Sequence, residues 1–250
     1  MKKILLIIAS LLFITSTAFP QSKANVNSLK EYGGKAFKVD DDEPYTGRVF
    51  DLNESTGKKT LQGQYKNGLI TGKWTYWYEN GQKKRKNTYK DGKKDGLQTY
   101  WYENGQKNKE GTYKDGIKDG LLTRWYENGQ KTYEGTHKDG KQDGLWTEWY
   151  ENGQKKEEGT HKDGKQDGLW TEWYENGQKS SEGIIKGKDE SGNIIKDGLS
   201  TGWHPSGQKT YEGTYKDGEK DGKWVYWAND IIYDWDTFFK QSPQNDVIFF

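Results

Sequence analysis

Cysteine is missing from the whole chain of 250 residues. Its absence excludes a disulfide framework, a thiolate metal site and a lipid-modified cysteine near the N-terminus. Long aliphatic runs are also missing after residue 18. Globular proteins of this length normally bury such runs, so the chain cannot be organised around one large aliphatic core.

Neither sign of charge dominates the chain. It carries 39 basic and 38 acidic residues, and the two signs are interleaved along its length. Binding to a phosphate backbone requires a clustered positive field. The balance therefore argues against a nucleic-acid partner.

The sequence patterns of common catalytic sites are absent as well. There is no cysteine nucleophile, no Gly-x-Ser-x-Gly elbow and no glycine loop that would hold a phosphate before a helix. Pairs of carboxylates recur in every repeat, and no pair is set apart from the others. We predict a protein that is not an enzyme and uses no cofactor or metal.

The N-terminal residues have the pattern of an export signal. Lys2 and Lys3 precede the apolar run Ile4–Ile14, and small residues follow. This pattern is typical of a secretory signal peptide over residues 1–18, and the run is too short to span a bilayer as a helix. We expect export from a bacterial cytoplasm to the periplasm or the exterior, no membrane insertion after cleavage, and a polar leader over residues 19–44.

A 24-residue repeat dominates the rest of the chain. Its clearest markers are the glycines of the Asn-Gly pairs and their counterpart in the last unit: Gly81, Gly105, Gly129, Gly153, Gly177 and Gly207. The last step is longer because the unit is expanded near 184–196. We expect about seven units over residues 45–229.

Each unit reads as two strands joined by a tight turn. The segment Leu145–Tyr150 is rich in aromatic and β-branched residues, and Asn152-Gly153 follows it. Asn-Gly predicts a two-residue type I′ turn, which would place Trp146 opposite Gly159, and Asp139-Gly140 predicts a similar turn at the other end. The fold class expected is all-β: an elongated antiparallel meander, or solenoid, of tandem β-hairpins.

Alternation along the strands predicts two faces. One face would carry a structural ladder of tryptophans together with Leu97, Leu121, Leu145, Leu169 and Leu199. The ladder residues are Trp77, Trp101, Trp125, Trp149, Trp173, Trp203 and Trp227. The other face would carry the candidate binding residues Tyr78, Tyr102, Tyr126, Tyr150, Tyr174, Trp146 and Trp170. The pattern leaves open which face is the drier one.

Two neighbouring segments resemble a known repeat. The first is Gly144–Lys155, of the form Gly-x-Trp-x-x-Trp-Tyr-Glu-Asn-Gly-Gln-Lys, and the second is Glu-Gly-Thr-His-Lys-Asp-Gly-Lys at 158–165. They resemble the MORN-variant repeat of the YwqK-type antitoxin family. The resemblance extends from about Tyr45 to Trp227. It implies a β-hairpin solenoid with a binding role and no catalytic residues, since the motif consists of turn and packing positions.

Three other features have structural explanations. His137 and His161 occupy a column that holds tyrosine in other units, so we expect aromatic packing rather than metal binding. Aspartates before glycines such as Asp139 are typical of tight turns, and calcium needs a denser set of oxygens. The aromatic and acidic tail at 230–250 is expected to cap the last strand; the alternative is a segment that docks on a partner.

These observations lead to two functional hypotheses. The first is an exported repeat scaffold that binds another protein, whose identity the sequence does not specify. The alternative is a module that binds a carbohydrate or cell-wall polymer through exposed tyrosine and tryptophan rings.

Overall fold

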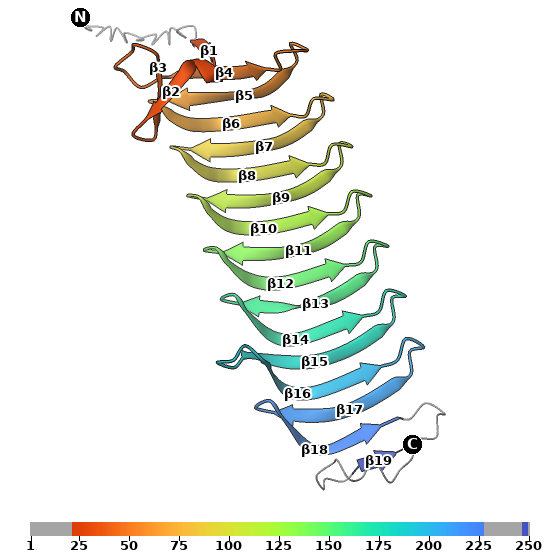
Figure 1. Cartoon of the computed structure of the whole chain (residues 1–250). Helices are drawn as coiled ribbons and strands as arrows, with labels where there is room; N and C mark the ends of the chain where they lie inside the picture. The colour runs from red at the N-terminus through yellow and green to blue at the C-terminus, as the bar shows by residue number, and fades with distance from the viewer. Residues whose placement is uncertain (1–21, 228–246, 250) are drawn as a thin grey trace, which may run out of the picture.

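A computed structural model describes residues 22–227 and 247–249, and it contains one long, open β-sheet (Figure 1). Seventeen strands form this sheet, and those from β4 to β18 run antiparallel in chain order. The described residues contain no α-helix, and their helical structure is limited to a short 3₁₀ turn. No helix among them is long and apolar enough to cross a membrane. The predicted fold class, an elongated antiparallel meander of tandem hairpins, is confirmed.

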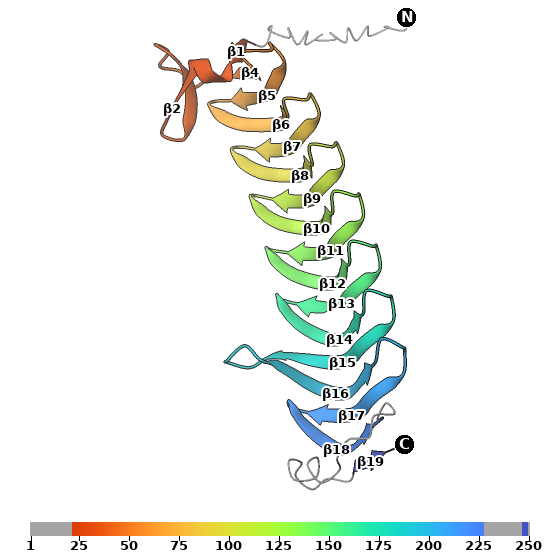
Figure 2. The ribbon, with the colours of Figure 1, turned by 45° about the vertical axis from the view of Figure 1, so that its right-hand side comes forward.

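The meander consists of β4 (Gly47–Leu52), β5 (Lys59–Lys66), β6 (Leu69–Trp77), β7 (Lys83–Lys90), β8 (Lys93–Trp101), β9 (Lys107–Lys114), β10 (Ile117–Trp125), β11 (Lys131–Lys138), β12 (Lys141–Trp149), β13 (Lys155–Lys162), β14 (Lys165–Trp173), β15 (Lys179–Lys188), β16 (Ile194–Trp203), β17 (Lys209–Lys216) and β18 (Glu219–Tyr226). Each repeat supplies one hairpin, and the next hairpin continues the same sheet. The strands are curved along their length, so the sheet is a bent ribbon (Figure 2).

The two kinds of turn differ, and one prediction about them is wrong. Asp139 and Gly140 both have positive φ, 49° and 84°, as a type I′ turn requires. In the other turn only Gly153 does, with a φ of 85°. There the N–H of Gly153 donates to the carbonyl of Tyr150 at 2.9 Å, and the loop runs from Tyr150 to Gln154. The Asn-Gly turn is therefore a longer loop that ends in a left-handed glycine.

The predicted register is nevertheless correct. Trp149 pairs with Lys155 and Glu148 pairs with Glu157, so one extra residue bulges out beside the loop. The longer loop and the bulge together leave Trp146 opposite Gly159, as a two-residue turn would have done. A second irregularity, between Gly135 and His137, recurs in nearly every unit and contributes to the bend of the strands.

Both ends of the sheet are covered by short parallel strands. β1 (Lys23–Asn25) pairs with β4, and the short 3₁₀ turn η1 (Val26–Ser28) leads to the separate hairpin of β2 (Leu29–Tyr32) and β3 (Lys35–Lys38). Part of the polar leader expected over residues 19–44 is thus folded. At the other end β19 (Val247–Phe249) pairs with β18. Residues 228–246 of the expected cap, and the signal peptide, lie outside the described residues.

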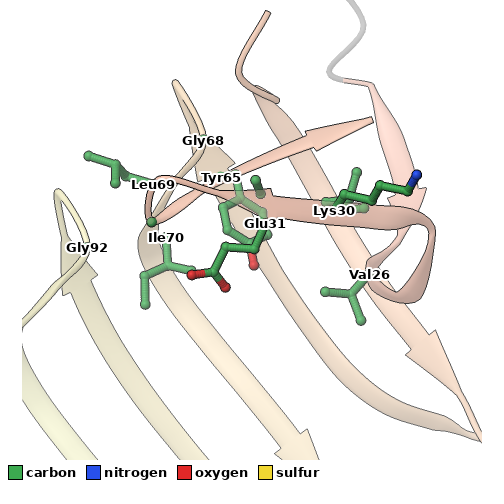
Figure 3. Close-up of a pocket in the computed structure, with 11 residues that line it drawn as sticks. Val26, Lys30, Glu31, Tyr65, Gly68, Leu69, Ile70 and Gly92 are labelled. Carbon is green, nitrogen blue, oxygen red and sulfur yellow. The ribbon is translucent and has the colours of Figure 1, made fainter. Parts of the chain in front are cut away.

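The N-terminal hairpin leaves a pocket of about 370 Å³ against the start of the sheet (Figure 3). Apolar side chains, among them Val26, Leu69 and Ile70, make up much of its wall, and Lys30 and Glu31 border it. We regard the pocket as a by-product of end capping.

The expanded unit forms a longer hairpin. β15 and β16 pair out to Lys188 and Ile194, and Figure 2 shows this hairpin projecting beyond the edge of the neighbouring ones. Lys186 lies near its base and contacts Asp197 and Asp217 at 3.2 and 2.7 Å. These exposed ion pairs tie the insertion to the following unit.

Candidate functional site

Of the two faces of the sheet, the one opposite the predicted tryptophan ladder has the more deeply buried side chains and is the drier face. We call it the packed face. It is centred on a column with one residue per unit, most of them large and all buried: Trp74, Gln98, Leu122, Trp146, Trp170, Ser200 and Trp224. The other face, called the ladder face, carries Trp77 and its counterparts, which are only half-buried.

The rings of the packed face form a continuous cluster around Trp146. Its ring stacks on Tyr133, with centroids 4.8 Å apart, and meets the edges of His137 at 6.1 Å and His161 at 5.8 Å. The ring also lies against Gly135, where an added Cβ would come within 2.0 Å of it. Trp146 pairs with two glycines, Gly135 on the preceding strand and Gly159 on the following one. Its ring covers Gly135 and not Gly159.

This packing corrects the prediction that Trp146 and Trp170 belong to a binding surface. They are 9% and 6% exposed, and bare glycine backbone lies under each ring. A ring that is covered by the side chains and backbone of the neighbouring strands cannot offer its face to a partner. Both residues are structural.

The histidines act as aromatic packing groups, as predicted. His161 lies between Trp146 and Trp170, with ring centroids 5.8 and 5.3 Å from theirs. Burial lowers the pKa of both His137 and His161, with a further contribution to His137 from Lys118. Among the described residues no group of three or more potential ligands could hold a metal ion.

A pH dependence of stability follows from these two histidines. Because their pKa values lie below the unfolded value of about 6.5, the unfolded chain binds more protons, and stability is lost as the pH falls through that value. In the double variant His137→Tyr, His161→Tyr, which restores the residue of other units, we expect a urea midpoint that changes less between about pH 7.5 and pH 6. An unchanged pH dependence would contradict the assignment.

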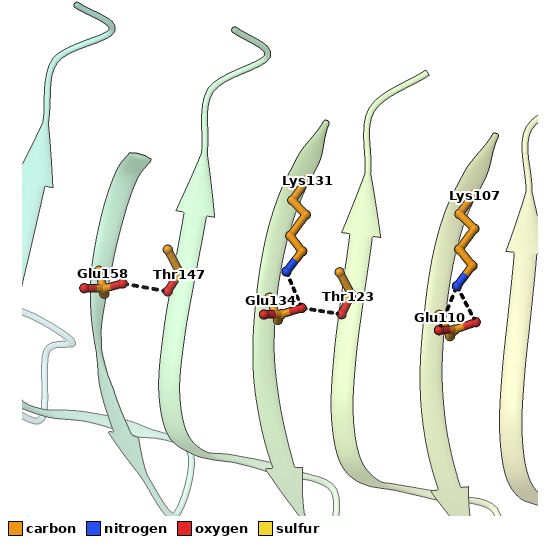
Figure 4. A network of polar contacts seen from close by, with 7 residues as sticks. All are labelled: Lys107, Glu110, Thr123, Lys131, Glu134, Thr147 and Glu158. Atoms are coloured by element: carbon orange, nitrogen blue, oxygen red, sulfur yellow. Dashed lines mark hydrogen bonds and ion pairs between the residues drawn. The ribbon is translucent and has the colours of Figure 1, made fainter. Parts of the chain in front are cut away.

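The ladder face repeats one polar network in successive units (Figure 4). Thr147 donates to Glu158 at 3.0 Å, and Lys155 forms an ion pair with the same carboxylate at 2.7 Å. The same contacts recur at Thr123, Glu134 and Lys131. In a further unit the hydrogen bond from Lys179 lowers the pKa of Glu182. In the five units that contain this glutamate, a lysine of the same strand neutralises its charge.

The predicted ladder is made of tryptophan and lysine rather than of stacked rings. The lysine of each network, or its counterpart, lies over the tryptophan of the next unit at 5.3 to 5.9 Å. The pairs are Lys59–Trp77, Lys83–Trp101, Lys107–Trp125, Lys131–Trp149, Lys155–Trp173, Lys179–Trp203 and Lys209–Trp227. Such cation–π contacts join neighbouring repeats.

The predicted tyrosine column lies in the loops and fastens one loop to the next. Each hydroxyl donates to the backbone carbonyl of the next unit's ladder tryptophan at 2.8 to 3.1 Å. These residues are Tyr78, Tyr102, Tyr126, Tyr150 and Tyr174. The neighbouring asparagines, such as Asn152, make a parallel bond to the following loop, here to the carbonyl of Glu175. The column is therefore engaged in packing between repeats.

Five leucines of the ladder face are among the large apolar side chains that remain open to solvent. Leu97, Leu121, Leu145, Leu169 and Leu199 are between 49% and 57% exposed. Leu145 lies opposite Thr160, and Leu169 lies opposite Ile184, which is itself 41% exposed. We call this line of leucines and their β-branched neighbours the leucine row.

A second line of side chains crosses the packed face and differs from unit to unit. Its members are directly paired from strand to strand, and we call it the variable row: Tyr76, Arg85, Tyr100, Lys109, Arg124, Tyr133, Glu148, Glu157, Glu172, Ser181, Gly202, Tyr211 and Tyr226. Sequence reasoning missed it. The detectable signal was one repeat position at which the charge changes sign along the chain.

A family model, described as the MORN repeat variant, matches the chain in six consecutive segments. The matched residues are 70–91, 94–115, 118–139, 142–163, 166–186 and 196–217. No curated protein matches the chain. The matched segments cover more than half of the sequence and follow the hairpins of the sheet one by one, so this chain belongs to the MORN repeat variant family.

Proposed function

We propose that the protein is an exported, non-enzymatic scaffold that binds another protein along the leucine row. The observation that supports this proposal most strongly is the exposure of five leucines at equivalent positions in successive hairpins. Equivalent strands lie two strand spacings apart, or about 9.6 Å, so the row extends over several repeats. Aligned apolar side chains of this kind are typical of protein interaction surfaces.

Exposed apolar groups favour a protein partner over a sugar. Sugar rings stack on open aromatic faces, whereas the ladder tryptophans lie beneath lysines and the tyrosine hydroxyls are bonded to the next loop. Aliphatic side chains contribute to binding by burial, which suits another protein. Carbohydrate binding is the second candidate, supported by the abundance of half-buried rings.

The sequence also supports the location of this activity. A secretory pattern over residues 1–18 would carry the scaffold out of the cytoplasm. The resemblance to YwqK-type antitoxin repeats favours a binding role, and export would bring the scaffold to a partner in the cell envelope or outside the cell. A cytoplasmic toxin would not meet the exported protein.

The test is a pull-down from envelope extracts with the mature chain as bait, run beside a glycan array. We expect one protein to be captured by the wild type and lost with the double variant Leu145→Glu, Leu169→Glu. Leu52→Glu is the matched control, because Leu52 is 40% exposed but lies outside the row. Capture that survives in the double variant, or binding to glycans alone, would overturn the proposal.

A further inference from the structure

The variable row is divided by charge. Arg85, Lys109 and Arg124 lie on β7, β9 and β10, and the three glutamates Glu148, Glu157 and Glu172 lie on β12, β13 and β14. Tyr133 on β11 separates the two groups. The row is accessible, since Arg124 and Glu172 are exposed and the others are half-buried.

Each half of the row places like charges side by side. Lys109 pairs directly with Arg124, and Glu157 pairs with both Glu148 and Glu172. Burial and then Arg124 lower the pKa of Lys109, while burial and then Glu148 raise the pKa of Glu157. Like charges directly opposite one another on a sheet are destabilising, so each half costs folding free energy.

The ladder face shows that the chain can pair its charges. There, each glutamate of the network has a lysine within 3.0 Å in five units. In the variable row the closest ion pair found among residues 22–227 is the contact of Glu148 with Lys156 at 3.7 Å. Arg124 instead lies over Tyr133 at 5.2 Å. The opposite charges on the row itself lie two or more strands away, beyond direct contact.

We propose that the variable row is a self-complementary interface through which two copies of this chain form a two-fold symmetric dimer. The axis runs parallel to β11, close to Tyr133, and brings the two packed faces together. A two-fold interface requires that if one residue contacts a second, the second also contacts the first in the partner. The order of charges along the row meets this requirement.

The symmetry can be followed strand by strand. Rotation about β11 places β10 opposite β12, β9 opposite β13, and β8 opposite β14. Arg124 of one copy then faces Glu148 of the other, Lys109 faces Glu157, and Tyr100 faces Glu172, and each contact occurs twice. Facing sheets pack about 10 Å apart, a gap that opposed long side chains such as arginine and glutamate bridge.

This dimer does not depend on the proposed function. The partner surface proposed above is the leucine row on the ladder face, which stays open when two packed faces meet. A failed pull-down would therefore leave the dimer intact, and a monomeric protein would leave the pull-down result unaffected.

The experiment is sedimentation velocity of the mature chain and two charge-reversal variants. We expect a dimer for the wild type at low salt, and dissociation near 1 M salt, where the screening length is about 3 Å. Lys109→Glu with Arg124→Glu, and Glu148→Lys with Glu157→Lys, should each weaken the dimer at least tenfold. Mixed in equal amounts, with one variant fluorescently labelled, the two should form a heterodimer, because positions 124 and 148, and positions 109 and 157, again face each other with opposite charges.

A matched control is Lys138→Glu with Lys162→Glu, which changes the charge equally at exposed lysines outside the row and should leave the dimer unchanged. Circular dichroism melting of every variant verifies the fold. A wild type that stays monomeric at low salt overturns the proposal. So does a dimer that persists in both variants, or a pair of monomeric variants that fail to combine. Binding of a different protein to the row, without self-association, has the same consequence.

Discussion

Replacing Trp146 with alanine is expected to lower the free energy of unfolding by about 3–5 kcal/mol, the range for a large buried aromatic side chain. The side chain is 9% exposed and contacts Tyr133, His137 and His161. Its loss would leave a cavity lined by these rings and by Gly135. Neighbouring hairpins are held in place by the same cluster, so the surrounding structure has little freedom to collapse.

The matched comparison is Trp149→Ala, three residues away on the ladder face. Trp149 is half-buried, with Lys131 over its ring at 5.5 Å. Partial burial and one cation–π contact lead us to expect a loss of about 1–2 kcal/mol. Urea unfolding followed by circular dichroism of the full chain measures both changes. A larger loss for Trp149 than for Trp146 would show that the ladder face is the drier one.

The second large effect is expected from Gly135→Ala, which adds one methyl group beneath the ring of Trp146. The new Cβ would lie 2.0 Å from Cε3 of that ring, far inside van der Waals contact. The φ of Gly135 is not in the positive region, so alanine is accepted by the backbone and the cost is purely steric. Overpacking of this kind destabilises by about 1–3 kcal/mol.

Gly183→Ala is the control, because Gly183 occupies the same position in a unit that has Ser200 in place of the tryptophan. The nearest atom to its added Cβ is the Ser200 Oγ at 3.3 Å, and a serine hydroxyl can rotate away. Alanine also restricts the unfolded chain, so the expected change is neutral or a gain of about 0.4–1 kcal/mol. Only the substitution at Gly135 should thus lower the stability. Equal losses at both positions would contradict the packing described for Trp146.

The amino-acid sequence by itself determined the repeat, the strand order and the register. These follow from local chemistry: Asp139-Gly140 accepts two positive φ angles, and the short links between strands allow only antiparallel neighbours. The pairing of Trp146 with Gly159 could be predicted even though the turn type was wrong. The number of residues between two paired positions sets the register. The longer loop and its bulge together leave Trp146 paired with Gly159, as a two-residue turn would have done. The aromatic role of His161 followed from its place in a tyrosine column.

The tertiary structure decided which face of the sheet has buried side chains and which side chains remain exposed to a partner. Alternation shows that Trp146 and Trp149 point to opposite sides of a strand, but both sides carry rings. Which rings become buried depends on the neighbouring strands, which supply Tyr133, His161 and the bare backbone of Gly135 around Trp146. The bond from the Tyr150 hydroxyl to the carbonyl of Trp173 joins residues 23 apart, a contact that no local pattern specifies. The variable row likewise exists only because neighbouring strands bring one repeat position into line. Burial and adjacency are properties of the assembled sheet, and a single repeat does not contain them.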